Sequence, residues 1–213
     1  MVRINKVHTG VGDKGHTTHL DGTHVSKSDK RLCVVGSIDE LNSIIGIIQM
    51  ELQRIPTTTL DGGPRATVLK VQSQVSKKLA LIQQELFDFG GECSAHPNKI
   101  PEGMVILPDS VCERLLDEMN EWLDDLQPIS SFILPTGNPV VANLHLARTV
   151  TRRVERNLAS LRDQDGDDSV RLFSMCYINR LSDWLFVLSR WITTVLGEEE
   201  TLWVPLSERE KAD

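Results

Sequence analysis

Four arginines and a histidine lie close together between Asn143 and Arg156, in a chain of 213 residues whose formal net charge is −7. Arginine side chains bind phosphate or carboxylate oxygens through paired hydrogen bonds. On a helix that advances about 100° per residue, most of these cations share one face. That face carries His145, Arg148, Arg152 and Arg156. Like charges one turn apart repel each other unless an anion offsets them. The stretch therefore predicts either a polyphosphate site or ion pairs with carboxylates of neighbouring helices.

The opposite face of the same stretch is apolar, which predicts burial against other elements. It is formed by Val140, Leu144, Ala147, Thr151, Val154, Leu158 and Leu161. Asn138 and Pro139 have the residue types expected at the cap and the first turn of a helix, so we expect the arginine-bearing helix to begin there.

A glycine-rich stretch near the start of the chain is the second candidate for chemistry. The sequence Thr-Gly-Val-Gly-Asp-Lys-Gly-His-Thr-Thr runs from Thr9 to Thr18. Small residues let backbone amides approach an anion closely. Gly10 and Gly15 have the separation of the glycines in a Walker A loop, but His16 stands where that motif needs lysine. Taken alone, the stretch is compatible with an anion-binding loop or with an ordinary surface loop.

The histidines do not form a recognisable metal site. Four of them, His8, His16, His19 and His24, fit no common ligand spacing for zinc. A di-iron centre of the ferritin type would need Glu-x-x-His pairs on facing helices, and the chain contains none. We expect no metal that is bound by protein ligands alone.

Composition favours a soluble helical protein. Hydrophobic residues make up 40% and charged residues 25% of the chain, and the low aromatic content of 5% favours aliphatic helix packing. The negative net charge argues against general binding to nucleic acid or to anionic membranes. No apolar run approaches the length of a membrane span, and the first residues lack the apolar core of a signal peptide. The cysteines Cys33, Cys93, Cys112 and Cys176 form no CxxC pair. We therefore expect a protein of the reducing cytoplasm.

Five segments with helical periodicity predict an all-α five-helix bundle. The first begins at Ser37, where Ser-Ile-Asp-Glu has the form of a capping box, and ends before Pro56. The second spans about residues 65–89, and Gly90-Gly91 is expected to end it. Their apolar stripes are Ile38, Leu41, Ile45, Ile48, Leu52 and Ile55 in the first, and Val68, Val71, Val75, Leu79, Ile82, Leu86 and Phe89 in the second.

The remaining helices follow in the second half of the chain. The third starts near Asp109, the fourth is the arginine-bearing helix, and the fifth spans about residues 168–196 and ends at Gly197. The stripe of the fifth comprises Phe173, Tyr177, Leu181, Leu185, Leu188 and Ile192, and a second face aligns Asn179, Asp183 and Arg190.

One domain, residues 1–213, is expected to contain all of these elements. Residues 1–36 have no period and would form a loop segment, residues 37–196 the bundle, and residues 197–213 an acidic tail. The tail holds one apolar patch, residues 202–205.

Three isolated residues have ordinary structural interpretations. Asp39 would be a favourable charge in the first turn of the first helix. Asn179 could make a polar contact between helices, and Phe132 would by default be a core aromatic.

Together the motifs resemble the PduO-type corrinoid adenosyltransferases, or ATP:cob(I)alamin adenosyltransferases. That family shows a Thr-x-Thr-Gly-Asp-x-Gly-x-Thr loop, then Arg-Val-x-Lys and Asp-Glu-Leu-Asn-Ser. Later come Phe-Ile-Leu-Pro-Gly-Gly, Leu-His-x-Ala-Arg-Thr-Val-x-Arg-Arg-Ala-Glu-Arg and Tyr-Leu-Asn-Arg-Leu-Ser-Asp-x-Leu-Phe. The corresponding segments here are residues 9–17, 25–27, 39–43, 132–135, 144–156 and 177–186. Order and spacing agree over nearly the whole chain.

The resemblance implies a homotrimer of helical bundles with ATP and the corrinoid bound at subunit interfaces. A magnesium ion would bridge phosphate oxygens, and the N-terminal loop would wrap the triphosphate. The ATP-binding residues that it implies are Thr9, Gly10, Gly12, Asp13, Lys14, Gly15, Thr17, Lys27, Arg152, Arg153, Glu155, Arg156 and Asn179.

The reaction implied by the resemblance moves the 5′-deoxyadenosyl group of ATP to the cobalt(I) of a reduced corrinoid such as cobalamin. Asp39 would pair with Arg148 across the interface, and Phe132 would close the lower face of the corrin and exclude its axial base. Phe132 and Arg148 would therefore contact the corrinoid. The catalytic residues implied are Asp39, Phe132, Arg148 and Arg152. A reductase and an adenosylcobalamin-dependent mutase are the expected protein partners.

Two alternatives belong to other functional classes. The chain could be a non-catalytic, ATP-gated carrier that delivers adenosylcobalamin to a mutase, or a structural bundle whose arginines only pair with carboxylates. Departures from the family pattern are Val11, His24, Thr136 and Val154. Because the first two lie in the predicted nucleotide loop, we expect them to influence ATP affinity.

Overall fold

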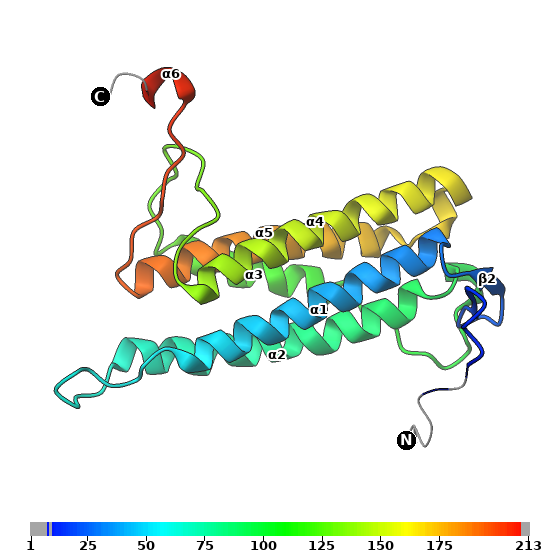
Figure 1. The fold of residues 1–213 in the computed structure, drawn as a ribbon, viewed down its shortest axis with the longest axis horizontal. Helices are drawn as coiled ribbons and strands as arrows, with labels where there is room; N and C mark the ends of the chain where they lie inside the picture. The colour runs from blue at the N-terminus through cyan, green and yellow to red at the C-terminus, as the bar shows by residue number, and fades with distance from the viewer. Residues whose placement is uncertain (1–7, 9, 210–213) are drawn as a thin grey trace.

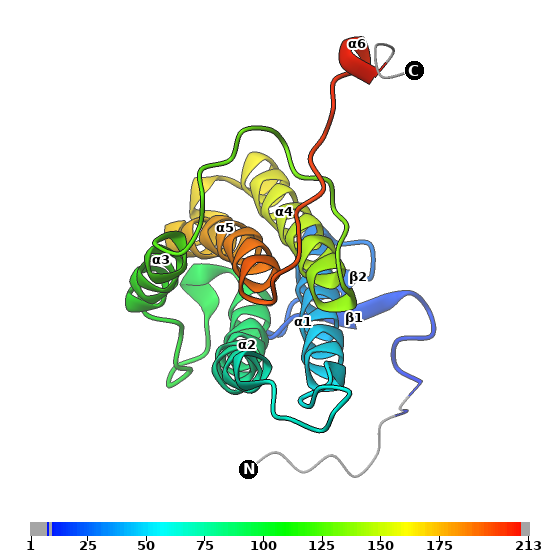
Figure 2. The same cartoon turned by 90° about the vertical axis from the view of Figure 1, so that its left-hand side faces the viewer.

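Five long helices form the structure, a computed structural model that describes residue 8 and residues 10–209 (Figure 1). Four of them lie side by side: α1 (Lys30–Arg54), α2 (Ala66–Cys93), α4 (Pro139–Asp165) and α5 (Leu172–Val195). α1 packs against α2 and α4, and α4 packs against α5. α3 (Ser110–Leu123) covers the outer side of α5, as the end-on view in Figure 2 shows. The predicted all-α five-helix bundle is confirmed.

Shorter elements lie at the two ends of the bundle. Strands β1 (His16–Thr18) and β2 (His24–Ser26) pair as an antiparallel hairpin beside the start of α1 (Figure 1). The 3-10 turns η1 (Pro97–Lys99) and η2 (Asp167–Ser169) follow α2 and α4. α6 (Leu206–Arg209) stands away from the opposite end of the bundle.

Each long helix buries the stripe that its periodicity predicts. In α1, α2 and α5, the stripe residues predicted from the sequence are buried, except Ile55, which follows the end of α1 and is half-buried. The predicted apolar face of α4 is also buried along its whole length, from Val140 to Leu161. Burial of these aliphatic side chains is the main favourable contribution to folding, at roughly 25 cal/mol per Å² of apolar area removed from water.

The prediction that the first helix begins at Ser37 is wrong, because α1 begins seven residues earlier. Asp29 caps it by accepting a hydrogen bond from the backbone N–H of Arg31 at 2.8 Å. Ser37 lies inside the helix and donates its hydroxyl to the carbonyl of Cys33. Asp39 is consequently in the third turn, so its predicted place as a charge at the helix N-terminus is wrong as well.

Gly90 and Gly91 do not end the second helix, contrary to the prediction. α2 continues through both glycines to Cys93, and neither glycine has the positive φ typical of a glycine that ends a helix. A Cβ on Gly90 would lie 3.5 Å from Ile38, and one on Gly91 would lie 3.3 Å from Met104. The local stop signal is overridden by packing against α1 and the segment after α2.

The fifth helix begins at Leu172 instead of near residue 168, because residues 167–169 form the turn η2. Its other end agrees with prediction, since Gly197 follows it with a φ of +72°.

α3 is attached to the bundle by ion pairs. Arg114 donates to both carboxylate oxygens of Glu85 on α2, at 2.6 and 2.8 Å, and to Glu118 at 3.1 Å. Trp184 of α5 donates to the other oxygen of Glu118 at 2.7 Å. Burial raises the pKa of Glu85 against the opposing effect of Arg114.

Among the described helices, α1 alone is long and apolar enough by length and composition to cross a membrane. The expectation that no apolar run approaches the length of a membrane span is therefore wrong by length and composition. The apolar residues of α1 explain it, because they pack against α2 and α4 as part of the core.

Candidate functional site

α4 presents most of the predicted arginine face outward. Arg152 and Arg156 are exposed, and Arg148 is half-buried. His145 does not belong to that exposed face, contrary to the prediction, because it is buried beside Phe186 with their ring centroids 6.3 Å apart. His145 is covered by the segment before α4 and the segment after α5, which contribute Leu134 and Thr201 beside it.

A groove with a volume of about 970 Å³ opens beside this face. Its size is at the upper end of the range for small-molecule sites. Its walls come from α4, α5, the segment before α4 and the C-terminal segment. The lining side chains that carry charge or an aromatic ring are Phe132, Arg148, Arg152, Asp183, Phe186, Trp203 and Glu208.

One wall of the groove is a two-armed flap, formed by residues 127–137 and residues 198–204. The arms pair through their backbones, with Leu134 N–H donating to Thr201 at 2.8 Å and Trp203 N–H donating to Phe132 at 2.6 Å. Phe132 and Trp203 meet edge to face with ring centroids 6.0 Å apart. Phe132 is 79% exposed, so its default interpretation as a core aromatic is wrong.

The opposite wall of the groove carries Arg148 and Arg152 of α4 beside Asp183 of α5. The Arg148 guanidinium lies 5.9 Å from the Phe186 ring, and its Nε has no hydrogen-bond partner among the described residues. Burial, followed by the charge of Arg152, lowers the pKa of Arg148. Two adjacent arginines with an unpartnered donor favour an anion at this wall, because it would offset both charges.

Other predicted phosphate ligands already have partners within the chain. Arg153 donates to Glu40 of α1, and Asn179 donates to Glu155 at 2.9 Å. Both contacts lie at exposed or half-exposed positions. Arg153 therefore points toward α1, on a different side of α4 from the groove-lining Arg152.

The predicted nucleotide loop lies next to the hairpin at the other end of the bundle. Lys27 approaches its backbone so closely that a Cβ on Gly12 would lie 2.8 Å from the Lys27 Nζ. Gly10 and Gly15 have φ values of +72° and +78°, which favour glycine over residues with side chains. Lys27 N–H also donates to Gly15 at 2.8 Å. The loop is thus a tight backbone turn with one ammonium group beside it.

The remaining predicted ATP-binding residues of the loop differ in how exposed they are. Thr9 lies outside the described residues. Asp13 and Lys14 are exposed, and Thr17 is half-buried on β1. None of the described hydrogen bonds or ion pairs joins this loop to the arginines of α4.

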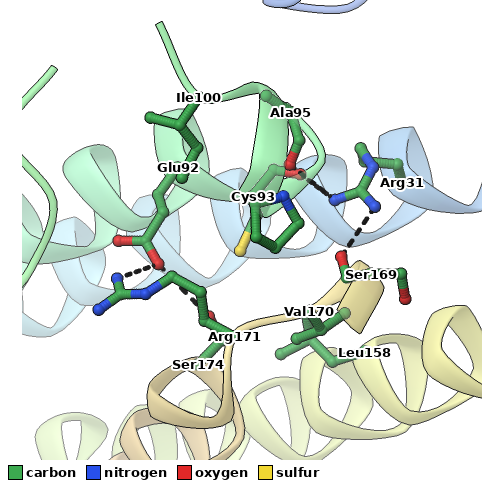
Figure 3. Close-up of a pocket in the computed structure, with 11 residues that line it drawn as sticks. Arg31, Glu92, Cys93, Ala95, Ile100, Leu158, Ser169, Val170, Arg171 and Ser174 are labelled. Atoms are coloured by element: carbon green, nitrogen blue, oxygen red, sulfur yellow. Dashed lines mark hydrogen bonds and ion pairs between the residues drawn. The ribbon is translucent and has the colours of Figure 1, made fainter. Parts of the chain in front are cut away.

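Arg31 fixes the hairpin to the bundle by anchoring the start of α1. Figure 3 shows its guanidinium reaching the segments after α2 and α4. It donates to the carbonyls of Ala95 and Ser169, both at 2.9 Å. The loop of the hairpin is held as well, with Leu20 N–H donating to Ser94 and His19 contacting Asp29 at 3.3 Å. The cavity in Figure 3 measures about 10 Å³ and holds at most one water, so it is structural.

Asp39 is exposed on α1, and within the described residues it forms no ion pair with any arginine. Its predicted pairing with Arg148 therefore stays a prediction about a second copy of the chain. The described residues also contain no cluster of three or more His, Cys, Asp or Glu side chains that could hold a metal ion.

The sequence did not identify several groove residues. Asp183, Phe186 and Trp203 line it without having been assigned a role. The signal that could have found Trp203 is its position in the one apolar patch of an acidic tail. Asp183 and Phe186 lie inside a recognised motif, but only the fold shows which face of α5 they share with the groove.

Comparisons with known proteins agree with this architecture. The family profile described as "Cobalamin adenosyltransferase" matches residues 7–192. A relative from Cupriavidus metallidurans, named cobalamin adenosyltransferase, is 35% identical over 201 residues, covering 94% of this chain and 95% of the relative. A relative from Mycobacterium tuberculosis, named corrinoid adenosyltransferase, is 32% identical over 212 residues, covering 98% of this chain and 97% of the relative.

Solved structures give the same result. A variant of a PduO-type ATP:corrinoid adenosyltransferase from Lactobacillus reuteri, complexed with cobalamin and ATP, has a TM-score of 0.78 at 26% identity. The similarity covers 94% of this chain and 100% of that one. This chain belongs to the cobalamin adenosyltransferase family.

Proposed function

We propose that this protein transfers the 5′-deoxyadenosyl group of ATP to the cobalt(I) of a reduced corrinoid and releases triphosphate. Membership of the family supports the reaction. The structural observation that carries it is the groove, because an exposed Phe132 and the arginines Arg148 and Arg152 line the same hollow. An apolar aromatic suits a corrin ring, and the guanidinium groups suit the phosphates of a nucleotide.

The reaction needs no general base from the protein. Cobalt(I) of the substrate is a strong nucleophile, and its electron pair forms the bond to the ribose 5′ carbon. The bond between that carbon and the triphosphate oxygen breaks, and the triphosphate leaves with the electron pair. The protein contributes by orienting the reactants and by stabilising charge on the leaving oxygen.

Cations around the triphosphate would provide that stabilisation. We assign this role to Lys27 in the loop and to Arg152, Arg153 and Arg156 on α4. Each well-placed cation can lower the barrier by about 2–4 kcal/mol. Arg153 would have to release or share Glu40 to contribute.

A magnesium ion would enter the site with the phosphates of ATP, and we assign it no ligand from the chain. The described residues offer no cage of carboxylates for it, and magnesium commonly binds through substrate phosphates and water with few protein ligands. When bound there, it would neutralise part of the charge that grows on the triphosphate.

A homotrimer would combine parts of the site that lie apart in one chain. The loop lies at the end of the bundle where α1 begins, and the flap stands at the opposite end (Figure 1). A second copy could therefore bring its loop to the groove, and its Asp39 to Arg148. A molar mass equal to that of one chain, measured by sedimentation equilibrium, would contradict the proposed homotrimer.

The cytoplasm is the proposed location, because the four cysteines are free thiols that suit a reducing compartment. A reductase that supplies cobalt(I) and a mutase that receives the product are the proposed partners.

Replacing Phe132 by alanine tests the corrinoid side of the groove. We expect kcat with reduced cobalamin to fall by at least about tenfold, because the ring that orients the corrin is lost. Phe87 is the matched control, since it is 75% exposed on α2 and lines no part of the groove. Equal turnover of the Phe132→Ala and Phe87→Ala variants would contradict the assignment.

A further inference from the structure

We propose that Arg190 is a positioning residue for the corrinoid, because it fastens both arms of the flap to α5. The inference rests on the proposed function only where it names the corrinoid as the ligand of the groove. The fastening itself is a property of the chain.

Arg190 is a buried side chain, 7% exposed, near the C-terminal end of α5. Its Nε donates to Glu200 at 2.8 Å, and its Nη2 donates to the carbonyl of Gln127 at 2.9 Å. Gln127 begins the first arm of the flap, and Glu200 belongs to the second. One guanidinium group therefore holds the base of both arms.

Within the flap, hydrogen bonds tie the two arms to each other. Backbone hydrogen bonds join Leu134 to Thr201 and Phe132 to Trp203. The Ser131 hydroxyl donates to the carbonyl of Trp203 at 2.8 Å. These bonds join the two arms into one unit, and Arg190 connects both arms of that unit to α5.

A second contact at the base is more exposed to solvent. Asn138, the cap of α4, donates to Glu198 at 2.7 Å, but both side chains are more accessible to solvent than Arg190. Solvent screens an exposed contact, whereas removing one partner of a buried ion pair leaves an uncompensated charge. Arg190 and Glu200 are consequently the main determinant of where the flap stands.

The position of Phe132 depends on this determinant. Phe132 lies in the middle of the first arm and contacts neither helix of the groove through a described hydrogen bond. A displacement of about 1 Å of a positioning group can cost roughly 100-fold in rate. Loosening the base should therefore disturb the corrinoid more than the nucleotide, whose predicted ligands lie on α4 and the N-terminal loop.

The substitution Glu200→Gln tests the proposal while keeping the shape of the side chain. We expect kcat/KM for reduced cobalamin to fall by about tenfold or more, and KM for ATP to change by less than about twofold. Glu199→Gln is the matched control, since it removes the same charge one residue away and Glu199 has no hydrogen bond among the described residues. Equal losses in both variants, or no loss in either, would overturn the proposal.

Tryptophan fluorescence gives a readout that does not depend on turnover. Trp203 is 38% exposed, whereas Trp122, Trp184 and Trp191 are buried. Quenching by iodide therefore reports mainly on the flap. Glu200→Gln should increase the quenched fraction while Glu199→Gln leaves it unchanged, and unchanged quenching in Glu200→Gln would overturn the fastening role. If the wild type binds no corrinoid but the quenching changes as expected, the proposed function fails and the fastening stands.

Arg190→Lys distinguishes fastening from charge alone. Lysine keeps the positive charge but cannot reach two acceptors with a planar fork. We expect an increase in quenching similar to that of Glu200→Gln, with helical content unchanged by circular dichroism. Wild-type quenching and wild-type cobalamin kinetics in this variant would contradict a role for the fork. If the Arg190→Lys variant does not fold, the kinetics and the quenching of the Glu200→Gln variant decide whether the contact holds the flap in place.

Discussion

Arg148 and Arg152 occupy successive turns of α4 but have different surroundings. Arg148 is half-buried against Phe186 with an unpartnered Nε, whereas Arg152 is exposed at the groove. The difference suits two roles, with Arg148 held in place for an acidic partner and Arg152 free to meet phosphate oxygens.

Replacing Arg152 by alanine should reduce kcat by about 100-fold or more, because a cation aimed at the developing charge is lost. Steady-state turnover at saturating ATP measures this. Arg162→Ala serves as the control, since Arg162 lies on the same helix and pairs with the exposed Asp167. Near-normal turnover of the Arg152→Ala variant would contradict the phosphate-binding assignment.

His145 should make stability depend on pH. Burial first, and then the charge of Arg148, lower its pKa from the usual value of 6.5, while Glu200 raises it. Since the unfolded state then binds more protons, the free energy of unfolding should fall as the pH decreases below about 6.5 toward the folded pKa. Denaturant unfolding at pH 7.5 and at pH 5.5 measures the loss, which His145→Gln should make smaller. An equal loss in both proteins would mean that His145 is not responsible.

At the scale of elements, the sequence predicted best what is decided locally. Asn138 caps α4 as its type and the following proline indicated, and it accepts hydrogen bonds from two backbone amides. The periodic stripes predicted the main buried faces of α1, α2, α4 and α5, but not the second buried face of α5, where Trp184 and Trp191 meet Trp122 of α3. The errors arose where distant contacts decide, as at Ser37, where Asp29 and the buried Arg31 start the helix earlier.

The flap could not be predicted in the same way. Its two arms are joined by hydrogen bonds between residues far apart in the chain, such as Leu134 and Thr201. No period in either segment encodes that pairing. The resemblance of the motifs identified Phe132, but only the fold shows that Trp203 stands beside it.

Gly90→Ala tests the correction to α2. We expect the free energy of unfolding to rise by about 0.5–1 kcal/mol, because alanine is the better helix former and its Cβ would meet Ile38 at an ordinary 3.5 Å. Gly137→Ala should instead destabilise, since Gly137 has a φ of +118° and a Cβ there would lie 2.9 Å from Val141. Urea unfolding measures both. Destabilisation by Gly90→Ala comparable to that by Gly137→Ala would show that α2 needs the glycine for its path.

At the scale of the whole molecule, the bundle separates two groups that the reaction needs. The loop with Lys27 lies at one end, and the groove with its flap lies toward the other (Figure 1). The arginines of α4 lie between them along one helix. This separation is the observation that supports the proposed homotrimer.

The most direct test is anaerobic turnover with chemically reduced cobalamin and magnesium-ATP, followed by the visible spectrum. The account predicts loss of the cobalt(I) absorption, formation of light-sensitive adenosylcobalamin and release of one triphosphate for each product. Tight binding of both substrates without product would contradict the catalytic claim and favour an ATP-gated carrier. Failure to bind ATP would instead favour a structural bundle whose arginines only pair with carboxylates.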